Sequence, residues 1–137
     1  MHHESARAPR RTLLAAVAGL ALALPFLGLF ILHRDGAYDL LTLILAFTGG
    51  IYGGAAVRTG APRAKAATEF AVGAAMVVVA ALSLWWSPIW LVAGYGAHAA
   101  WDVLHHARGG APGVHRWFPG FCAVFDVAVA VMVFVFT

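Results

Sequence analysis

Apolar residues fall into five long runs along this chain, and each run is bounded by a short polar or flexible segment. The runs cover residues 12–32, 38–57, 66–86, 88–107 and 118–137. A helix needs about 20 mostly apolar residues to cross the hydrocarbon core of a bilayer. Each run therefore predicts one transmembrane helix. The pattern as a whole predicts an all-α polytopic membrane bundle that forms a single domain over residues 1–137.

The segments between the runs have the composition of turns. Residues 33–36 and 58–65 are polar or basic, residues 87–88 are Ser-Pro, and residues 108–116 contain several Gly and Pro residues. Gly and Pro favour turns because they interrupt regular helices. The first run is longer than the apolar region of a cleaved signal peptide, so we expect it to be retained as a helix.

Composition excludes several other classes of protein. Hydrophobic residues make up 62% of the chain and charged residues 11%, against about 45–50% and about 25% in soluble domains. The mean hydropathy is +0.83. A disordered chain and a typical soluble enzyme do not fit these values. A disulfide scaffold is also excluded, because the chain has one cysteine, Cys122.

The basic residues predict an orientation. If the N-terminus is cytoplasmic, five helices place eight of the nine Lys and Arg residues on the cytoplasmic side and leave only Arg34 outside. Cytoplasmic loops of membrane proteins carry such an excess. The sequence therefore predicts a multi-pass protein of a bacterial inner (plasma) membrane. The net charge of +3 is then explained by loops rather than by nucleic-acid binding, which we do not expect.

Small residues in the second run predict close helix packing. Gly49/Gly53 and Gly50/Gly54 form two overlapping GxxxG patterns, and small residues at this spacing let two helix backbones approach closely. Packing within the bundle is the favoured interpretation. A homo-oligomer contact through one of the two pairs is the alternative.

Ionisable residues gather on one face of the fourth run. At about 100° per residue, five side chains share an arc of roughly 100°: Tyr95, His98, Asp102, His105 and His106. Asp126 in the fifth run and Glu69 in the third are expected at similar depth, in the cytoplasmic half of the bilayer. Charged groups within a membrane are costly and mark a functional site by default.

This residue set predicts metal binding or proton transfer. Imidazole and carboxylate groups bind zinc, copper and iron, so the candidate metal ligands are His98, Asp102, His105, His106 and Asp126. As catalytic groups, His98, Asp102 and Asp126 would move protons. Tyr95, Trp101 and Glu69 are the candidate substrate-binding residues. No nucleotide-binding motif is present.

The spacing His98-x3-Asp102-x2-His105-His106 resembles in part the histidine boxes of membrane di-iron desaturases and hydroxylases, which oxidise lipid-like substrates. Asp102 stands where such a box has histidine, and the sequence has no second box. The segments around Trp101 to His106 and Trp117 to Cys122 are also similar to small bacterial membrane proteins of uncharacterised function. That second similarity implies a membrane location and no activity.

Three classes of function fit these observations. The first is a metal-dependent oxidoreductase that acts on a lipophilic substrate within the bundle. The second is a metal-free acid/base isomerase of a lipid, and the third is a small proton- or ion-coupled transporter. A purely structural polar seam between helices is the remaining interpretation of the same residues. Membrane lipids are the expected surroundings in every case.

Overall fold

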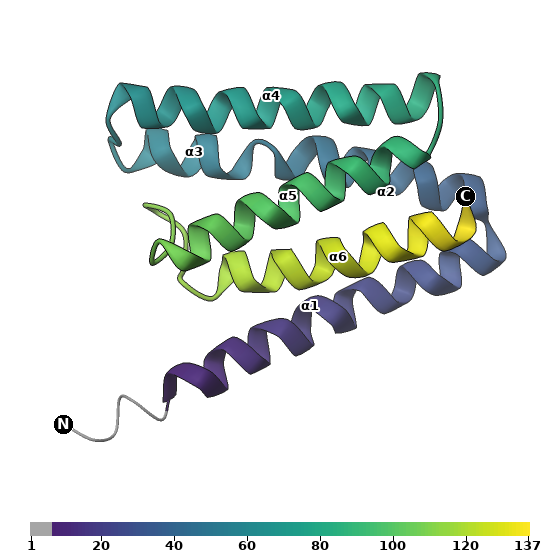
Figure 1. Ribbon diagram of the computed structural model, residues 1–137, viewed down its shortest axis with the longest axis horizontal. Helices are drawn as coiled ribbons and strands as arrows, with labels where there is room; N and C mark the ends of the chain where they lie inside the picture. Colours follow the sequence, from purple (N-terminus) through teal and green to yellow (C-terminus); the bar gives the residue numbers. More distant parts are fainter. Residues whose placement is uncertain (1–6) are drawn as a thin grey trace.

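The computed structural model describes residues 7–137, and this part of the chain is helical throughout apart from short loops. The elements are α1 (Arg7–Leu32), α2 (Arg34–Thr48), α3 (Ile51–Arg58), α4 (Arg63–Trp85), α5 (Ile89–Ala107) and α6 (Phe118–Phe136). Figure 1 shows them lying side by side as an elongated bundle. The predicted all-α class is confirmed, since residues 7–137 contain no strand.

Four segments are long and apolar enough to cross a membrane: residues 10–32, residues 34–58, α4 and α6. Large hydrophobic side chains cover the outside of the bundle, for example Leu13, Phe47, Val78 and Phe134. This is the composition of a helical membrane bundle. The fifth predicted span, α5, has 19 residues but is not among these four. Its two ionisable pairs, His98/Asp102 and His105/His106, lower its hydropathy.

The second predicted span differs from the expected single helix over residues 38–57. It consists of α2 and α3, which follow each other with a break at Gly49 and Gly50. The backbone tightens there, because the Gly50 N–H donates to the Phe47 carbonyl at 3.0 Å. The predicted turn over residues 33–36 is also shorter than expected. Only His33 interrupts the helices, and its Nδ1 accepts the Gly36 N–H at 3.0 Å, which caps α2.

Glycine explains how closely α2 and α4 pack. A Cβ atom on Gly49 would lie 2.8 Å from the Gly73 carbonyl oxygen, and a Cβ on Gly73 would collide with the Gly49 carbonyl. A Cβ atom on Gly53 would lie 3.0 Å from ring carbons of Phe70 on α4. Gly50 and Gly54 are exposed instead. The Gly49/Gly53 pattern therefore serves packing within the chain, in agreement with the favoured interpretation.

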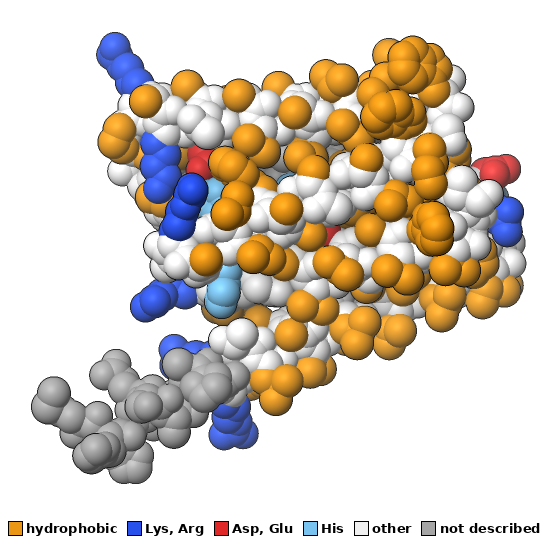
Figure 2. Space-filling view, viewed as in Figure 1, with side chains coloured by type: hydrophobic (Ala, Val, Ile, Leu, Met, Phe, Trp, Pro, Cys, Tyr) orange, Lys and Arg blue, Asp and Glu red, His pale blue; other side chains and the backbone are white. Residues whose placement is uncertain are grey.

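Helix α6 packs mainly against α5 and α1, and α3 packs against α4. The apolar core lies toward the end of the bundle where α1 meets α2, and includes Phe30, Leu41, Leu91, Val129 and Val133. The opposite end carries the start of α1, the α3–α4 loop and the α5–α6 loop (Figure 1). Lys and Arg side chains gather at this loop-bearing end (Figure 2). The ionisable residues of the bundle interior lie between this end and the apolar core.

Candidate functional site

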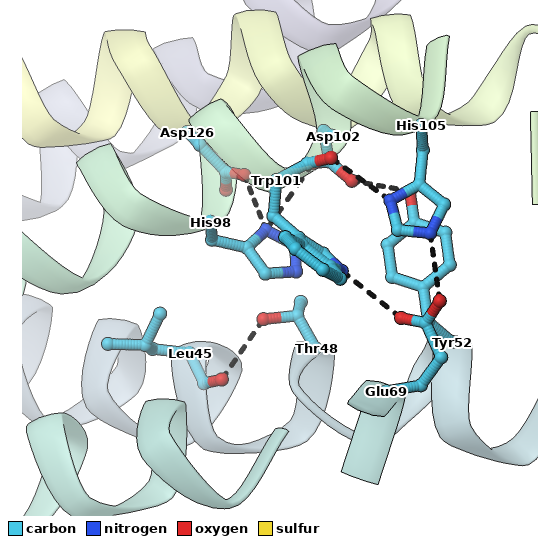
Figure 3. A network of polar contacts seen from close by, with 9 residues as sticks. All are labelled: Leu45, Thr48, Tyr52, Glu69, His98, Trp101, Asp102, His105 and Asp126. Atoms are coloured by element: carbon cyan, nitrogen blue, oxygen red, sulfur yellow. Dashed lines mark hydrogen bonds and ion pairs between the residues drawn. The ribbon is translucent and has the colours of Figure 1, made fainter. Parts of the chain in front are cut away.

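A buried imidazole faces two buried carboxylates where α5 packs on α6. His98 and Asp102 are one turn apart on α5, and Asp126 is on α6. The Nδ1 atom of His98 lies 2.7 Å from Oδ2 of Asp126 and 3.4 Å from Oδ2 of Asp102. All three side chains are almost completely buried, with exposed fractions of 2%, 0% and 1% for His98, Asp102 and Asp126. We name these three residues the His/Asp cluster (Figure 3).

The cluster has the composition of a cation site. One ligand atom from each of its three residues lies within 4.8 Å of the others. A buried carboxylate is either neutralised by protonation or balanced by a cation, and one imidazolium balances only one of these two. A divalent cation with a neutral histidine would balance both. Oδ2 of Asp102 also has no hydrogen-bond partner among the described residues, and the same is true of Nε2 of His98, the ring nitrogen that points away from the two carboxylates (Figure 3).

Tyr52 of α3 extends the cluster toward the loop-bearing end. Its hydroxyl donates to Oδ1 of Asp102, which leaves Oδ2 of Asp102 directed at His98. Its ring stacks on the imidazole of His105, with centroids 4.3 Å apart and planes 13° apart. Tyr52 is 4% exposed, so this phenol is part of the core. It orients one carboxylate of the cluster and connects it to the next polar group.

That next group joins α4 to α5. Glu69 accepts two hydrogen bonds, from Nε1 of Trp101 at 3.1 Å and from Nε2 of His105 at 3.0 Å. Nδ1 of His105 lies 3.0 Å from the Trp101 carbonyl. We name Glu69, Trp101 and His105 the Glu69 group. Its hydrogen bonds hold both nitrogens of His105, so this histidine is not available to the cluster without rearrangement.

The remaining predicted site residues lie elsewhere. Tyr95 is fully buried, but its hydroxyl donates to the Leu41 carbonyl at 2.7 Å and so joins α5 to α2. His106 is exposed at the end of α5. Of the five predicted metal ligands, the structure thus brings together His98, Asp102 and Asp126. His105 and His106 are not part of that group.

The model of a family of unknown function, DUF6010, matches residues 12–137. This chain belongs to the DUF6010 family. Searches of the curated proteins and of the solved structures found no match for this member.

Sequence reasoning missed Tyr52 in this family member. Its segment, Gly49 to Gly54, is rich in glycine and by pattern alone indicates only a packing motif. A buried phenol between paired glycines was the available signal, because a tyrosine in a membrane interior needs a hydrogen-bond partner for its hydroxyl. The partner could not be identified from the sequence, since Tyr52 and Asp102 are 50 residues apart.

Two kinds of chemistry fit the geometry. Ligand atoms around a tetrahedral ion with bonds of about 2.0–2.1 Å lie about 3.3 Å apart, and the His98–Asp102 separation of 3.4 Å matches this value. The His98–Asp126 contact of 2.7 Å would need to open by roughly half an ångström. Without a metal, the two carboxylates face the same Nδ1 atom of His98 and can stabilise an imidazolium, while Nε2 has no partner and can accept a proton from a substrate.

Proposed function

We propose that this protein is a multi-pass membrane protein that binds one divalent transition-metal ion at His98, Asp102 and Asp126. The observation that carries the proposal is the convergence of one imidazole and two carboxylates within 4.8 Å in a buried site. Zinc, iron and copper are the candidate ions, since each accepts imidazole nitrogen and carboxylate oxygen. Three protein ligands leave a coordination position for water or a substrate, as in catalytic rather than structural sites.

The surroundings of the cluster support this proposal. Groups that hydrogen-bond to ligating carboxylates orient them and raise affinity, and Tyr52 occupies this role toward Asp102. The site lies within the helix bundle, so a substrate that reaches it must be lipophilic or small. For the protein loaded with iron or copper we propose oxidation of such a substrate with dioxygen as the oxidant, whereas zinc has no redox chemistry and would not support it.

Metal analysis of purified protein tests the proposal. Wild-type protein in detergent, loaded with Zn²⁺, Fe²⁺ or Cu²⁺ and then desalted, is expected to retain about one ion per chain of the preferred metal. His98→Ala and Asp126→Asn should each retain roughly a tenth or less. His106→Ala is the matched control, because it removes an exposed histidine from the same helix and should retain wild-type metal. Undiminished metal in His98→Ala would contradict the proposal.

Metal-free acid/base catalysis is the second candidate, and the Tyr52–Asp102–His98–Asp126 contacts favour it. In that function His98 accepts a proton from a substrate and the two carboxylates stabilise the imidazolium, as in an isomerisation of a lipid. The metal analysis separates the two candidates. Absence of retained metal from wild-type protein after loading with all three ions would leave the acid/base function.

The proposed topology has five spans with a cytoplasmic N-terminus in a bacterial inner membrane. It treats α2 and α3 together as one span and includes α5, in which His98, Asp102 and His105 are buried within the bundle. Gly50 and Gly54, which are exposed, are the residues of the GxxxG pairs left for a homo-oligomer contact. The arrangement of basic residues at one end of the bundle supports this orientation.

A further inference from the structure

A second polar site lies at the loop-bearing end, apart from the His/Asp cluster. It is a pocket of about 370 Å³ between α4 and α5, lined by Lys65, Thr68, Glu69, Trp101, His105 and Arg108. We name it the rim pocket. Ligand sites in proteins start at about 300 Å³, so its size suits a small group rather than a whole lipid. Figure 2 shows Lys and Arg side chains gathered at this end of the bundle, with acidic and histidine surface visible between them.

The floor of the rim pocket is built from side chains that already have partners. Glu69 is 5% exposed and accepts hydrogen bonds from Trp101 and His105. The hydroxyl of Thr68 donates to the Ala64 carbonyl at 3.0 Å. These side chains are therefore fixed in position. Their N–H and O–H donors are already used, so the floor can exclude or accommodate a ligand by its shape but cannot donate a hydrogen bond to it.

The rim offers two cations. Lys65 stands in the first turn of α4 and Arg108 directly after α5, and both side chains are exposed. Neither forms an ion pair with any residue in the described part of the chain. Glu69 is the one carboxylate in the pocket lining, and its two hydrogen bonds direct it to Trp101 and His105. The charges of the pocket that are free to bind a ligand are thus positive.

The neighbouring surface is apolar. Leu104, one helical turn before the pocket residue Arg108, is 43% exposed. The ring of Trp101 is itself half-buried in the pocket wall. Tryptophan with an exposed leucine beside Lys and Arg is typical of the level where the hydrocarbon core meets the headgroups. A molecule with an anionic head and an apolar tail matches this arrangement, in which a positively charged pocket rim adjoins an apolar surface.

We propose that the rim pocket binds a phosphate group carried by an amphiphilic molecule, with Lys65 and Arg108 as its ligands. Arg binds phosphate oxygens through two parallel N–H donors, and Lys binds them as a point charge. Glu69 prevents the phosphate from descending into the pocket, so the head stays at the rim and the tail lies along the apolar surface. This site does not depend on metal at the His/Asp cluster.

Calorimetric titration of the full-length protein in detergent tests the proposal. The probes are short-chain phosphatidic acid, short-chain phosphatidylcholine and inorganic phosphate. We expect saturable binding of phosphatidic acid, weakened roughly tenfold by Lys65→Gln and by Arg108→Gln, which is the loss expected for one charge-assisted hydrogen bond. Arg63→Gln is the matched control, because Arg63 is also in the first turn of α4 but does not line the pocket. Lys65→Arg should keep most of the affinity.

The other possible results of the titration test separate parts of the proposal. Inorganic phosphate that binds as tightly as phosphatidic acid would overturn the amphiphilic part of the proposal and assign the two cations to free phosphate. Equal binding of phosphatidylcholine would overturn the proposal, because its neutral headgroup does not need the two cations. An equal loss in Arg63→Gln, or no saturable binding at all, would overturn it as well. Far-ultraviolet circular dichroism of every variant confirms that a loss of binding is not a loss of fold.

Discussion

At the scale of single residues, Tyr52 and Tyr95 each have a buried hydroxyl, but the two hydroxyls donate to different kinds of acceptor. Tyr52 donates to the carboxylate of Asp102, whereas Tyr95 donates to the Leu41 carbonyl. Both phenols join α5 to the segment formed by α2 and α3, and both rings are buried. Of the two hydroxyls, only that of Tyr52 donates to a member of the His/Asp cluster. Removal of each hydroxyl therefore distinguishes an orienting role from a structural one.

Tyr52→Phe is expected to weaken metal binding by roughly 10- to 100-fold, the usual effect of losing a hydrogen bond to a ligating group. It should also lower the free energy of unfolding by about 1–3 kcal/mol, because a buried carboxylate oxygen loses its donor. Tyr95→Phe should give a comparable loss of stability and leave metal affinity unchanged. Competition with a chelating dye measures the affinity and thermal melting measures the stability. Equal metal affinity in the two variants would rule out the orienting role.

Part of the candidate site could be predicted because a helix has a regular period. His98, Asp102 and His105 share one face by angle alone, and all three are buried. Angle could not separate His105 from the metal-binding group, because that depends on Glu69, whose depth and rotation on another helix are not encoded in the α5 sequence. The exposed His106 lies at the edge of the predicted arc, where a small error in angle decides whether a side chain faces the bundle.

At the scale of helices, the approach of α2 to α4 depends on two glycines. The Gly49 carbonyl occupies the space where a Cβ atom of Gly73 would lie. Gly73→Ala should therefore push the helices apart and lower the free energy of unfolding by about 1–3 kcal/mol, as overpacking generally does. Loss of melting temperature in detergent measures the effect.

Gly54→Ala is the control for this change. A Cβ atom on Gly54 would meet nothing within 4 Å, and alanine favours the helical state over glycine by about 1 kcal/mol. Its melting temperature should stay level or rise. A similar loss in both variants would mean that helix–helix contact does not explain the need for glycine at residue 73.

Helix limits could be read from the sequence to within a few residues for α4, α5 and α6, since apolar runs end where the chain leaves the bundle. The break between α2 and α3 could not be predicted from the sequence. Gly49 and Gly50 interrupt an otherwise apolar run, and hydropathy does not distinguish a helix that packs through glycine from one that breaks at glycine. The His33 cap was missed for a related reason. Its side chain replaces the missing backbone partner, so a single residue suffices where a longer turn was expected.

At the scale of the whole molecule, the few charges divide by location. Basic residues gather at the loop-bearing end, while Asp35 and Asp39 line a pocket near the opposite end. The buried carboxylates lie between these two ends, in contact with histidines. This division is expected if the loop-bearing end is cytoplasmic, because cytoplasmic loops retain Lys and Arg. In that orientation the rim pocket would lie at the cytoplasmic surface, where anionic lipid headgroups are abundant.

Labelling of single cysteines tests this orientation and the crossing of α5 together. In a Cys122→Ala background, Ser87→Cys lies between α4 and α5, His115→Cys lies at an exposed position of the α5–α6 loop, and Thr137→Cys follows α6. A membrane-impermeant thiol reagent applied to intact cells should label the cysteines at residues 87 and 137, and should label the one at residue 115 only after permeabilisation. The polar face of α5 is turned into the bundle, so its low hydropathy does not prevent it from crossing. If the cysteines at residues 87 and 115 were equally accessible in intact cells, α5 would not span the membrane, and the two ends of the bundle could not lie on opposite sides.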